Sequence, residues 1–259
     1  MGKVFIVGAG PGDQELITVK ALKCIQTADV IMYDRLVNKE LLAYAKKDAD
    51  LIYCGKLPNY HTMKQETINK FLVKFAKSGK TVTRLKGGDP YLFGRGGEEA
   101  EYLVKNHIAY EVVPGITACV AASSYSGIPL THRHVSGNVA IITGHRAKEE
   151  NHQLNDVRYL QSVDTLCIYM GVGNLQTIQQ KLLNAKKDKL TPVAFVEWAS
   201  TPLQRTTIST LENMVEDAQK QKIENPCLII IGDVVKFHSK LNWFEEKNHK
   251  ELAIHAGAT

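Results

Sequence analysis

Strand-like and helical patterns alternate along the first half of the chain, and this alternation restricts the fold more than any other feature. The strand-like runs are VFIVG, VIMYD, DLIYC, KTVTRL and YEVV. The clearest helical pattern between them is the one-sided stripe of Ile68, Phe71, Leu72, Phe75 and Ala76. Alternation of this kind predicts an α/β fold with a mostly parallel sheet.

The second half repeats the pattern with NVAIITG, TLCIYMG, PVAFVEW, RTTIST and CLIIIGD, and with helical stretches between several of these runs. The turn signal Pro114-Gly115 is the best candidate boundary between the halves. After about Lys236 the pattern decays. We therefore expect two α/β lobes in series with mostly parallel sheets, at residues 1–114 and 115–240, and a peripheral or disordered tail at 241–259.

A glycine-dense segment, RLKGGDPYLFGRGGEE at residues 84–99, follows the KTVTRL run, where an α/β sheet delivers its chain to a ligand. Gly87 and Gly88 lack a β-carbon, so main-chain amides can approach a small molecule closely. The carboxylate of Asp89 beside them argues against a polyanion and favours a locally neutral or cationic ligand. A simple tight turn remains the alternative.

A second glycine motif, VFIVGAGPGD at residues 4–13, runs into a segment that places Leu16, Val19, Leu22 and Ile25 on one face of a helix. This strand, turn and helix layout is typical of a nucleotide-binding unit. However, Asp13 stands where the dinucleotide fingerprint has glycine or alanine, and it would compete with a pyrophosphate. Asp34 falls about where a ribose-binding acid would stand. Asp13 thus weakens the hypothesis of an NAD-dependent or flavin-dependent oxidoreductase, which stays an alternative.

Composition excludes several other classes of protein. The chain has 259 residues, 44% of them hydrophobic, with no apolar run long enough for a membrane span and no signal-peptide pattern. We expect a soluble, cytoplasmic protein without a membrane partner. Its five cysteines are scattered without a C-x-x-C pair, which excludes a zinc ribbon or a disulfide framework and suits a reducing compartment.

The charge pattern argues against nucleic acid as a partner. The net charge is +5, but the basic residues are spread along the chain without an aromatic-basic platform, so a polyanionic metabolite is the better partner. His132, His134 and His145 lack the tight spacing of metal ligands, and we assign no metal.

From about Lys3 to Val235 the chain resembles the uroporphyrinogen-III C-methyltransferases, a family of S-adenosylmethionine-dependent tetrapyrrole methylases. The motifs that carry the resemblance stand in the family's order and include VGAGPGDQELIT, ADVIMYDRLV, VTRLKGGDPYLFGRGGEEA, YEVVPGITA, GIPLTHR and QRTTISTL. The resemblance implies methyl transfer from S-adenosylmethionine to two pyrrole carbons, on rings A and B of uroporphyrinogen III. The product would be precorrin-2, for sirohaem and cobalamin biosynthesis. It also implies a homodimer with the active site in a cleft between two lobes.

By the same resemblance, the proton acceptor falls on Asp34 and the proton donor on Lys56. The family's S-adenosylmethionine contacts fall on Pro11, Gly87, Gly88, Asp89, Leu92, Thr117, Ala118, Met170 and Ala199. A carboxylate at Asp89 near a cationic sulfonium makes electrostatic sense where a phosphate would not. Basic groups within the matched motifs could pair with the substrate's carboxylates or form structural ion pairs; they are Arg84, Lys86, Arg95, Arg133, Arg146 and Arg205.

The chain departs from the family's pattern after Lys56, where Leu57, Pro58, Asn59 and Tyr60 replace the usual arginine and glycine-rich turn. Because the chain begins directly at the methylase strand, we expect methylation without an added dehydrogenase or chelatase activity. Methylases of later corrin intermediates, of diphthamide or of ribosomal RNA are the nearest alternatives. A non-catalytic tetrapyrrole carrier is a further one, and the presence of Asp34 and Lys56 argues against it.

Overall fold

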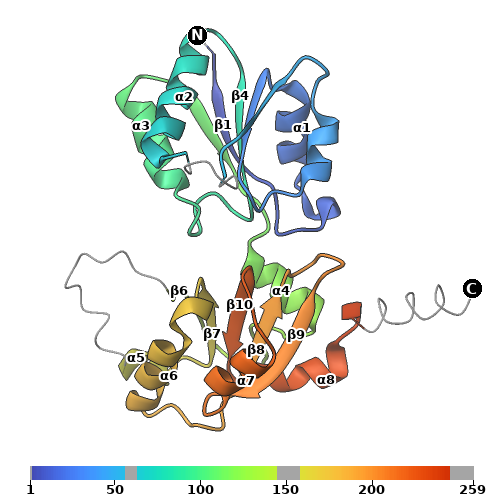
Figure 1. Ribbon diagram of the computed structural model, residues 1–259, viewed down its shortest axis with the longest axis vertical. Helices are drawn as coiled ribbons and strands as arrows, with labels where there is room; N and C mark the ends of the chain where they lie inside the picture. The colour runs from blue at the N-terminus through green and yellow to red at the C-terminus, as the bar shows by residue number, and fades with distance from the viewer. Residues whose placement is uncertain (1, 56–62, 145–157, 246–259) are drawn as a thin grey trace, which may run out of the picture. The chain divides into compact units, whose positions relative to one another are not determined.

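The computed structural model describes residues 2–55, 63–144 and 158–245. Contacts divide the chain into two compact units, Met1–Ala118 and Cys119–Thr259. Each unit is built on one five-stranded sheet with helices packed against it (Figure 1). The two α/β lobes in series that the sequence predicts are therefore present.

The sheet of the first unit is parallel throughout. Its strands are β1 (Val4–Gly8), β2 (Val30–Tyr33), β3 (Asp50–Tyr53), β4 (Val82–Lys86) and β5 (Tyr110–Val113). They lie in the order β3-β2-β4-β1-β5, so that the first strand of the chain is flanked by β4 and β5. The register places Val4 beside Val82 on one side and beside Tyr110 on the other. The parallel sheet predicted for this half of the chain is confirmed.

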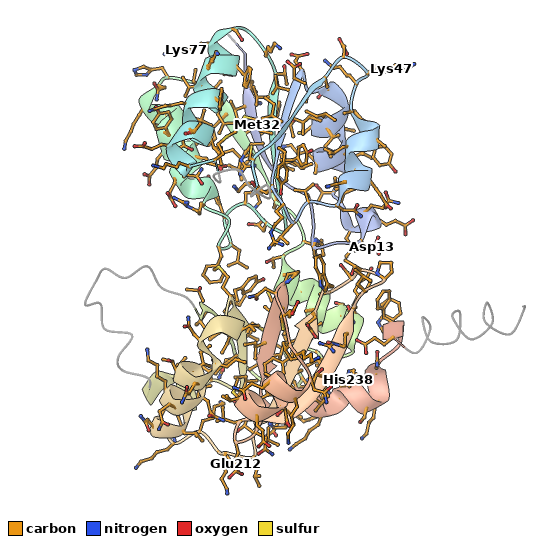
Figure 2. All side chains as sticks on the ribbon, in the orientation of Figure 1. Asp13, Met32, Lys47, Lys77, Glu212 and His238 are labelled. Carbon is orange, nitrogen blue, oxygen red and sulfur yellow. The ribbon has the colours of Figure 1, made fainter. Side chains whose placement is uncertain are left out.

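Helices cover both faces of this sheet (Figure 1). On one face lies α1 (Val19–Thr27), and on the other lie α2 (Gln65–Lys77) and α3 (Gly96–Lys105). Two short 3-10 helices complete the described unit, η1 (Gln14–Leu16) and η2 (Lys39–Tyr44). Met32 of β2 lies in the core layer beneath α2 and α3 (Figure 2). The predicted stripe of α2 is confirmed, because its members are buried or pack against this core.

The face predicted for α1 is wrong in part. Val19 is 71% exposed, and the buried residues of the helix are Ala21, Cys24 and Ile25. Leu16 lies outside the helix, in η1, and the Thr18 hydroxyl caps α1 by accepting a hydrogen bond from the Ala21 N–H. Val19 and Ile25 share the helix but stand six residues apart, and at about 3.6 residues per turn this spacing places them roughly 120° apart around it.

The sheet of the second unit is mixed, which corrects the prediction of mostly parallel sheets. Its strands are β6 (Val139–Thr143), β7 (Thr165–Tyr169), β8 (Pro192–Glu197), β9 (Arg205–Thr210) and β10 (Cys227–Ile231), in the order β6-β7-β10-β8-β9. Only β6 and β7 pair in parallel. The short connection between β8 and β9 cannot hold the crossover that parallel strands need, and β10 enters between β7 and β8 in the opposite direction.

Helices α6 (Leu175–Asn184) and α7 (Met214–Lys220) bury one face of this second sheet. The remaining helices of the described unit are α4 (Ala118–Ser126), α5 (Arg158–Gln161), η3 (Val172–Asn174), η4 (Asp233–Phe237) and α8 (His238–Leu241). After α8 the Trp243 and Phe244 rings pack on Tyr125 of α4, with ring centroids 5.2 and 4.8 Å away. The domain limits predicted from the sequence, including a tail that starts at residue 241, remain predictions.

All five cysteines are free and buried, as expected for small apolar side chains rather than for a disulfide framework. Within the described ranges, no helix combines the length and the apolar character needed to cross a lipid bilayer.

The burial of α1 can be tested on the helix itself. Replacing Ile25, which is fully buried, with alanine should lower the free energy of unfolding by about 2–5 kcal/mol, because it leaves a cavity under the helix. Val19→Ala on the same helix should change it by less than about 0.5 kcal/mol, since Val19 faces solvent. Urea unfolding of both variants measures the two values, and equal losses would contradict the phase of the helix.

Candidate active site

The connections that leave β1 and β4 diverge at the carboxyl edge of the first sheet. The chain leaves β1 through α1 on one face, and it leaves the neighbouring β4 through α3 on the other face. Such a reversal between adjacent parallel strands is a topological switch point, where open α/β sheets form their ligand sites. Both glycine motifs found in the sequence stand at this point.

Main chains from three strand ends approach here so closely that side chains are excluded. Gly10 and Gly88 form an isolated bridge, in which the Gly88 N–H donates to the Gly10 carbonyl over 2.7 Å. A Cβ atom added to Gly8 would lie 2.6 Å from the Gly88 oxygen, and one added to Gly115 would lie 2.8 Å from the Gly8 Cα. Real Cβ atoms essentially never come that close to backbone, so glycine is required at both positions.

Asp89 fastens these loops together through its carboxylate. Its Oδ1 accepts hydrogen bonds from the N–H groups of Tyr91 (2.8 Å) and Leu92 (3.2 Å). Its Oδ2 accepts one from the Gly115 N–H, 3.1 Å away across the junction. From the sequence, Asp89 was expected to act electrostatically toward a ligand, and its structural role in joining the loops was not predicted. The signal was present, because an aspartate before a proline is a common turn initiator.

The predicted cofactor residues of the first unit lie close to one another around this junction. Gly88 has a φ of +68°, and a Cβ atom there would lie 3.9 Å from both the Thr117 Cα and the Ala118 N, in otherwise open space. Pro11 directly follows the bridging Gly10, and Leu92 is held by Asp89. The sequence motifs thus converge on one small main-chain surface.

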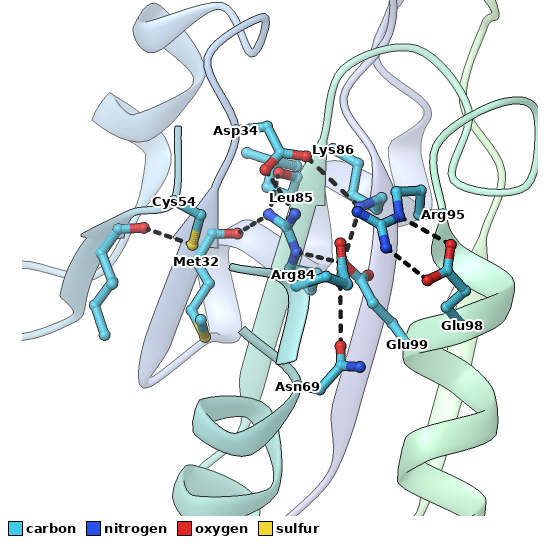
Figure 3. Close-up of polar contacts among 12 residues, drawn as sticks. Met32, Asp34, Cys54, Asn69, Arg84, Leu85, Lys86, Arg95, Glu98 and Glu99 are labelled. Atoms are coloured by element: carbon cyan, nitrogen blue, oxygen red, sulfur yellow. Dashed lines mark hydrogen bonds and ion pairs between the residues drawn. The ribbon is translucent and has the colours of Figure 1, made fainter. Parts of the chain in front are cut away.

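Asp34 follows β2 and belongs to a cluster of four charged side chains (Figure 3). The Arg84 Nη2 donates to the Asp34 Oδ1 at 2.6 Å, and the Arg84 Nε donates to the Glu99 Oε1 at 3.0 Å. The Lys86 Nζ lies 2.9 Å from the same Glu99 oxygen and 3.6 Å from the Asp34 Oδ2. Arg84, Lys86 and Glu99 are buried, whereas the Asp34 side chain is 31% exposed. Asp34 is therefore the solvent-facing member of the cluster.

Successive residues of β4 lie on opposite faces of the sheet. Leu85 lies on the face covered by α1, so Arg84 and Lys86 lie on the face covered by α2 and α3, and the charged cluster forms there. From α2, Gln65 also donates to the Glu99 Oε1, at 3.0 Å. Burial by itself would lower the pKa of the Arg84 guanidinium, but the carboxylates of Glu99 and Asp34 outweigh burial and raise this pKa above its ordinary value. The buried guanidinium is therefore fully charged.

Glu99 is a residue that sequence reasoning missed. It adjoins Glu98 in the GGEE segment, and the residue types alone do not separate the two. Helical spacing does: Glu99 stands one turn before Leu103, which is fully buried, whereas Glu98 is exposed and pairs with Arg95.

Ion pairs within the chain engage four of the six basic residues considered as partners of substrate carboxylates. Arg84 and Lys86 belong to the buried cluster, Arg95 binds both oxygens of Glu98 at 2.8 and 2.7 Å, and Arg205 pairs with Glu197. Lys56, the predicted proton donor, lies outside the described residues, as do Arg146 and the divergent residues 57–60.

Met170 and Ala199 belong to the second unit, in the loops that follow β7 and β8. Both strands run antiparallel to the intervening β10, so their carboxyl ends share one edge of the sheet. Met170 has a φ of +53°, and the two neighbours of Ala199, Trp198 and Ser200, have φ values of +48° and +61°. Left-handed backbone is uncommon outside glycine and concentrates at functional sites.

Comparison with known proteins identifies the family. A model of the tetrapyrrole (corrin/porphyrin) methylases matches residues 3–215. The uroporphyrinogen-III C-methyltransferase of Bacillus subtilis (strain 168) is 57% identical over 251 residues, which cover 97% of this chain and 98% of the relative.

Solved structures agree. A uroporphyrin-III C-methyl transferase from Thermus thermophilus, in complex with S-adenyl homocysteine, is similar with a TM-score of 0.77 and 40% identity, over 90% of this chain and 93% of that one. A cobalt precorrin-4 methyltransferase is similar with a TM-score of 0.78 and 28% identity, over 90% and 95% of the two chains. Because the family model and the relatives span most of the sequence, the chain belongs to the tetrapyrrole (corrin/porphyrin) methylase family.

Proposed function

We propose that this chain is a uroporphyrinogen-III C-methyltransferase, which transfers methyl groups from S-adenosylmethionine to two pyrrole carbons of uroporphyrinogen III, on rings A and B. The product is precorrin-2, for sirohaem or cobalamin biosynthesis. The observation that carries the proposal is the 57% identity to the Bacillus subtilis enzyme of that name over nearly the full length of both chains. The structure named for a later corrin intermediate is only 28% identical, which makes that alternative weaker.

The first unit fits S-adenosylmethionine because its strand ends offer main chain without side chains. A Cβ atom on Gly88 would meet only the Thr117 Cα and the Ala118 N within 4 Å, each at 3.9 Å, so the main chain beside Gly88 is open on that side. In the proposed site these residues, with Pro11, Gly87, Asp89 and Leu92, and with Met170 and Ala199 of the second unit, bind the cofactor. When bound, S-adenosylmethionine supplies a methyl group already activated on a sulfonium, so the protein's main task is alignment.

Asp34 is the proposed proton acceptor. Methylation leaves a cationic macrocycle that must lose a proton, and a partly exposed carboxylate at the edge of the sheet can take it. Lys56 is the proposed proton donor. Among the described residues no group of three or more histidine, cysteine, aspartate or glutamate side chains could hold a metal ion. The proposed chemistry needs none.

The proposal includes a cytoplasmic homodimer. Five buried free thiols suit a reducing compartment. Light scattering on the purified protein gives its mass in solution, and a monomer at micromolar concentration would contradict the dimer.

The proposed activity has a direct assay. Anaerobic incubation with uroporphyrinogen III and S-adenosylmethionine should yield a product that is heavier by two CH2 units, because each methylation adds a CH3 group and releases a proton. Calorimetry should show binding of S-adenosylmethionine but not of NAD. NAD is disfavoured because Asp13 stands at the pyrophosphate position. Tight NAD binding without any binding of S-adenosylmethionine would contradict the proposed methyltransferase activity. An unmodified uroporphyrinogen III, with methylation of a later corrin instead, would favour the alternative substrate.

The main-chain surface at Gly88 can be tested against a matched glycine. Gly88 and Gly79 both have positive φ values, +68° and +85°. A Cβ atom would meet nothing within 4 Å at Gly79 and only ordinary contacts, at 3.9 Å, at Gly88. Alanine should therefore cost a similar backbone strain at both sites, about 1–2 kcal/mol. Gly88→Ala should in addition weaken S-adenosylmethionine binding by on the order of tenfold or more, since the Cβ atom occupies ligand space. Gly79→Ala, in the turn after α2, should not. Equal affinities in the two variants would mean that the Gly88 loop is only a turn.

A further inference from the structure

Asp34 is held at both of its carboxylate oxygens. Its Oδ1 accepts a hydrogen bond from the Arg84 Nη2 at 2.6 Å, and its Oδ2 faces the Lys86 Nζ at 3.6 Å (Figure 3). Rotation of the carboxylate about its Cβ–Cγ bond would break or lengthen one of these contacts. The two cations therefore fix the direction in which the oxygens point.

Glu99 in turn holds both cations. The Arg84 Nε and the Lys86 Nζ donate to its Oε1 at 3.0 and 2.9 Å, and the Gln65 Nε2 donates to the same oxygen at 3.0 Å. Donors from β4 and α2 thus converge on one atom supplied by α3. Since Glu99 is fully buried, it cannot itself touch a substrate.

This cluster is an expensive way to stabilise a fold. Each buried charge loses several kcal/mol of hydration, and apolar residues of similar volume often serve stability as well or better. Moreover, the Oε2 of Glu99 is buried without a hydrogen-bond partner in the part of the chain that the structure describes. Apolar side chains such as Ile6, Met32 and Leu103 belong to the same layer, so apolar residues could have filled the positions of the charged ones. The charges are better explained by what they do to Asp34.

We propose that Glu99 is a positioning residue, which acts through Arg84 and Lys86 to hold the Asp34 carboxylate in the orientation that accepts the proton of the methylated macrocycle. The inference rests on the proposed function and on Asp34 as acceptor. The methylated pyrrole carbon already carries a carboxylated side chain and holds no hydrogen. In that step a C–H bond of the bridging carbon next to the methylated ring therefore breaks, and its electron pair neutralises the cationic macrocycle. The proton bonds to an oxygen of Asp34.

A double-mutant cycle between Asp34→Asn and Glu99→Gln tests the proposal. Single-turnover methylation of uroporphyrinogen III is measured at saturating S-adenosylmethionine, together with KM, cofactor affinity and melting temperature. Asp34→Asn should lower the rate on the order of 10²-fold or more, the usual contribution of a general base. Glu99→Gln keeps the size but removes the charge, and it should lower the rate on the order of tenfold with KM and cofactor affinity near wild type. The double variant should be no slower than Asp34→Asn alone, because Glu99 acts only through Asp34.

Two results would overturn the positioning role: a wild-type rate in folded Glu99→Gln, or losses that multiply in the double variant. Different results would show that the proposed methyltransferase activity, or the role of Asp34 as proton acceptor, is wrong. A wild-type protein that leaves uroporphyrinogen III unmethylated, or an Asp34→Asn variant with full rate, removes the proposed function or the acceptor, and the positioning role with it.

Thr83→Val is the matched control for lost stability. Thr83 is buried on β4 as well, but its hydroxyl donates to the Cys24 carbonyl on the opposite face, at 2.9 Å. This variant should melt earlier at an unchanged single-turnover rate per folded molecule. If Glu99→Gln does not fold, Arg84→Met/Glu99→Met removes one charge of each sign from the same layer and should fold. A reduced rate in that variant supports the positioning role, and a wild-type rate overturns it.

Discussion

Contact between main chains at Gly8, Gly88 and Gly115 determines the form of the first unit's carboxyl edge. Three neighbouring strands end there, and their loops approach within distances that exclude a β-carbon. The Gly10–Gly88 bridge and the Asp89 carboxylate then join the loops, so that Thr117 and Ala118 arrive beside Gly88. A side chain at Gly8 or Gly115 would separate the loops, and the residues proposed to bind the cofactor would no longer lie together.

Strand β4 connects this junction to the proposed proton acceptor. On one of its faces Leu85 packs into the core under α1, and on the other Arg84 and Lys86 hold Asp34. Gly87 follows Lys86 directly, so the proposed methyl-donor loop continues from the strand that carries the residues proposed to orient Asp34, and this strand is paired on both sides. A rigid element of this kind keeps reacting groups in fixed relation, which is what methyl transfer requires of a protein.

The sequence predicted the elements better than their arrangement. Every strand-like run became a strand, because apolar β-branched runs between turn signals are local features. The direction of β10 was not predictable, since the same apolar run can enter a sheet either way and tertiary packing decides. At the site, the glycines were found because their effect is local. Glu99 was assigned no role, because its partner Arg84 lies on β4. Asp89 was assigned a role toward a ligand and not toward the fold, because its partner Gly115 follows β5.

The charge balance of the cluster links its buried members to Asp34. Arg84 and Lys86 bring two positive charges into the layer, and Glu99 supplies one carboxylate, so Asp34 provides the second partner for the two cations. Buried charges without partners are strongly destabilising, which ties this cluster to the carboxylate of Asp34. Glu99 cannot present its carboxylate to a ligand, because no part of that side chain reaches solvent. Asp34 can, since about a third of its side chain is exposed, so the cluster fixes a carboxylate at the surface of the first unit.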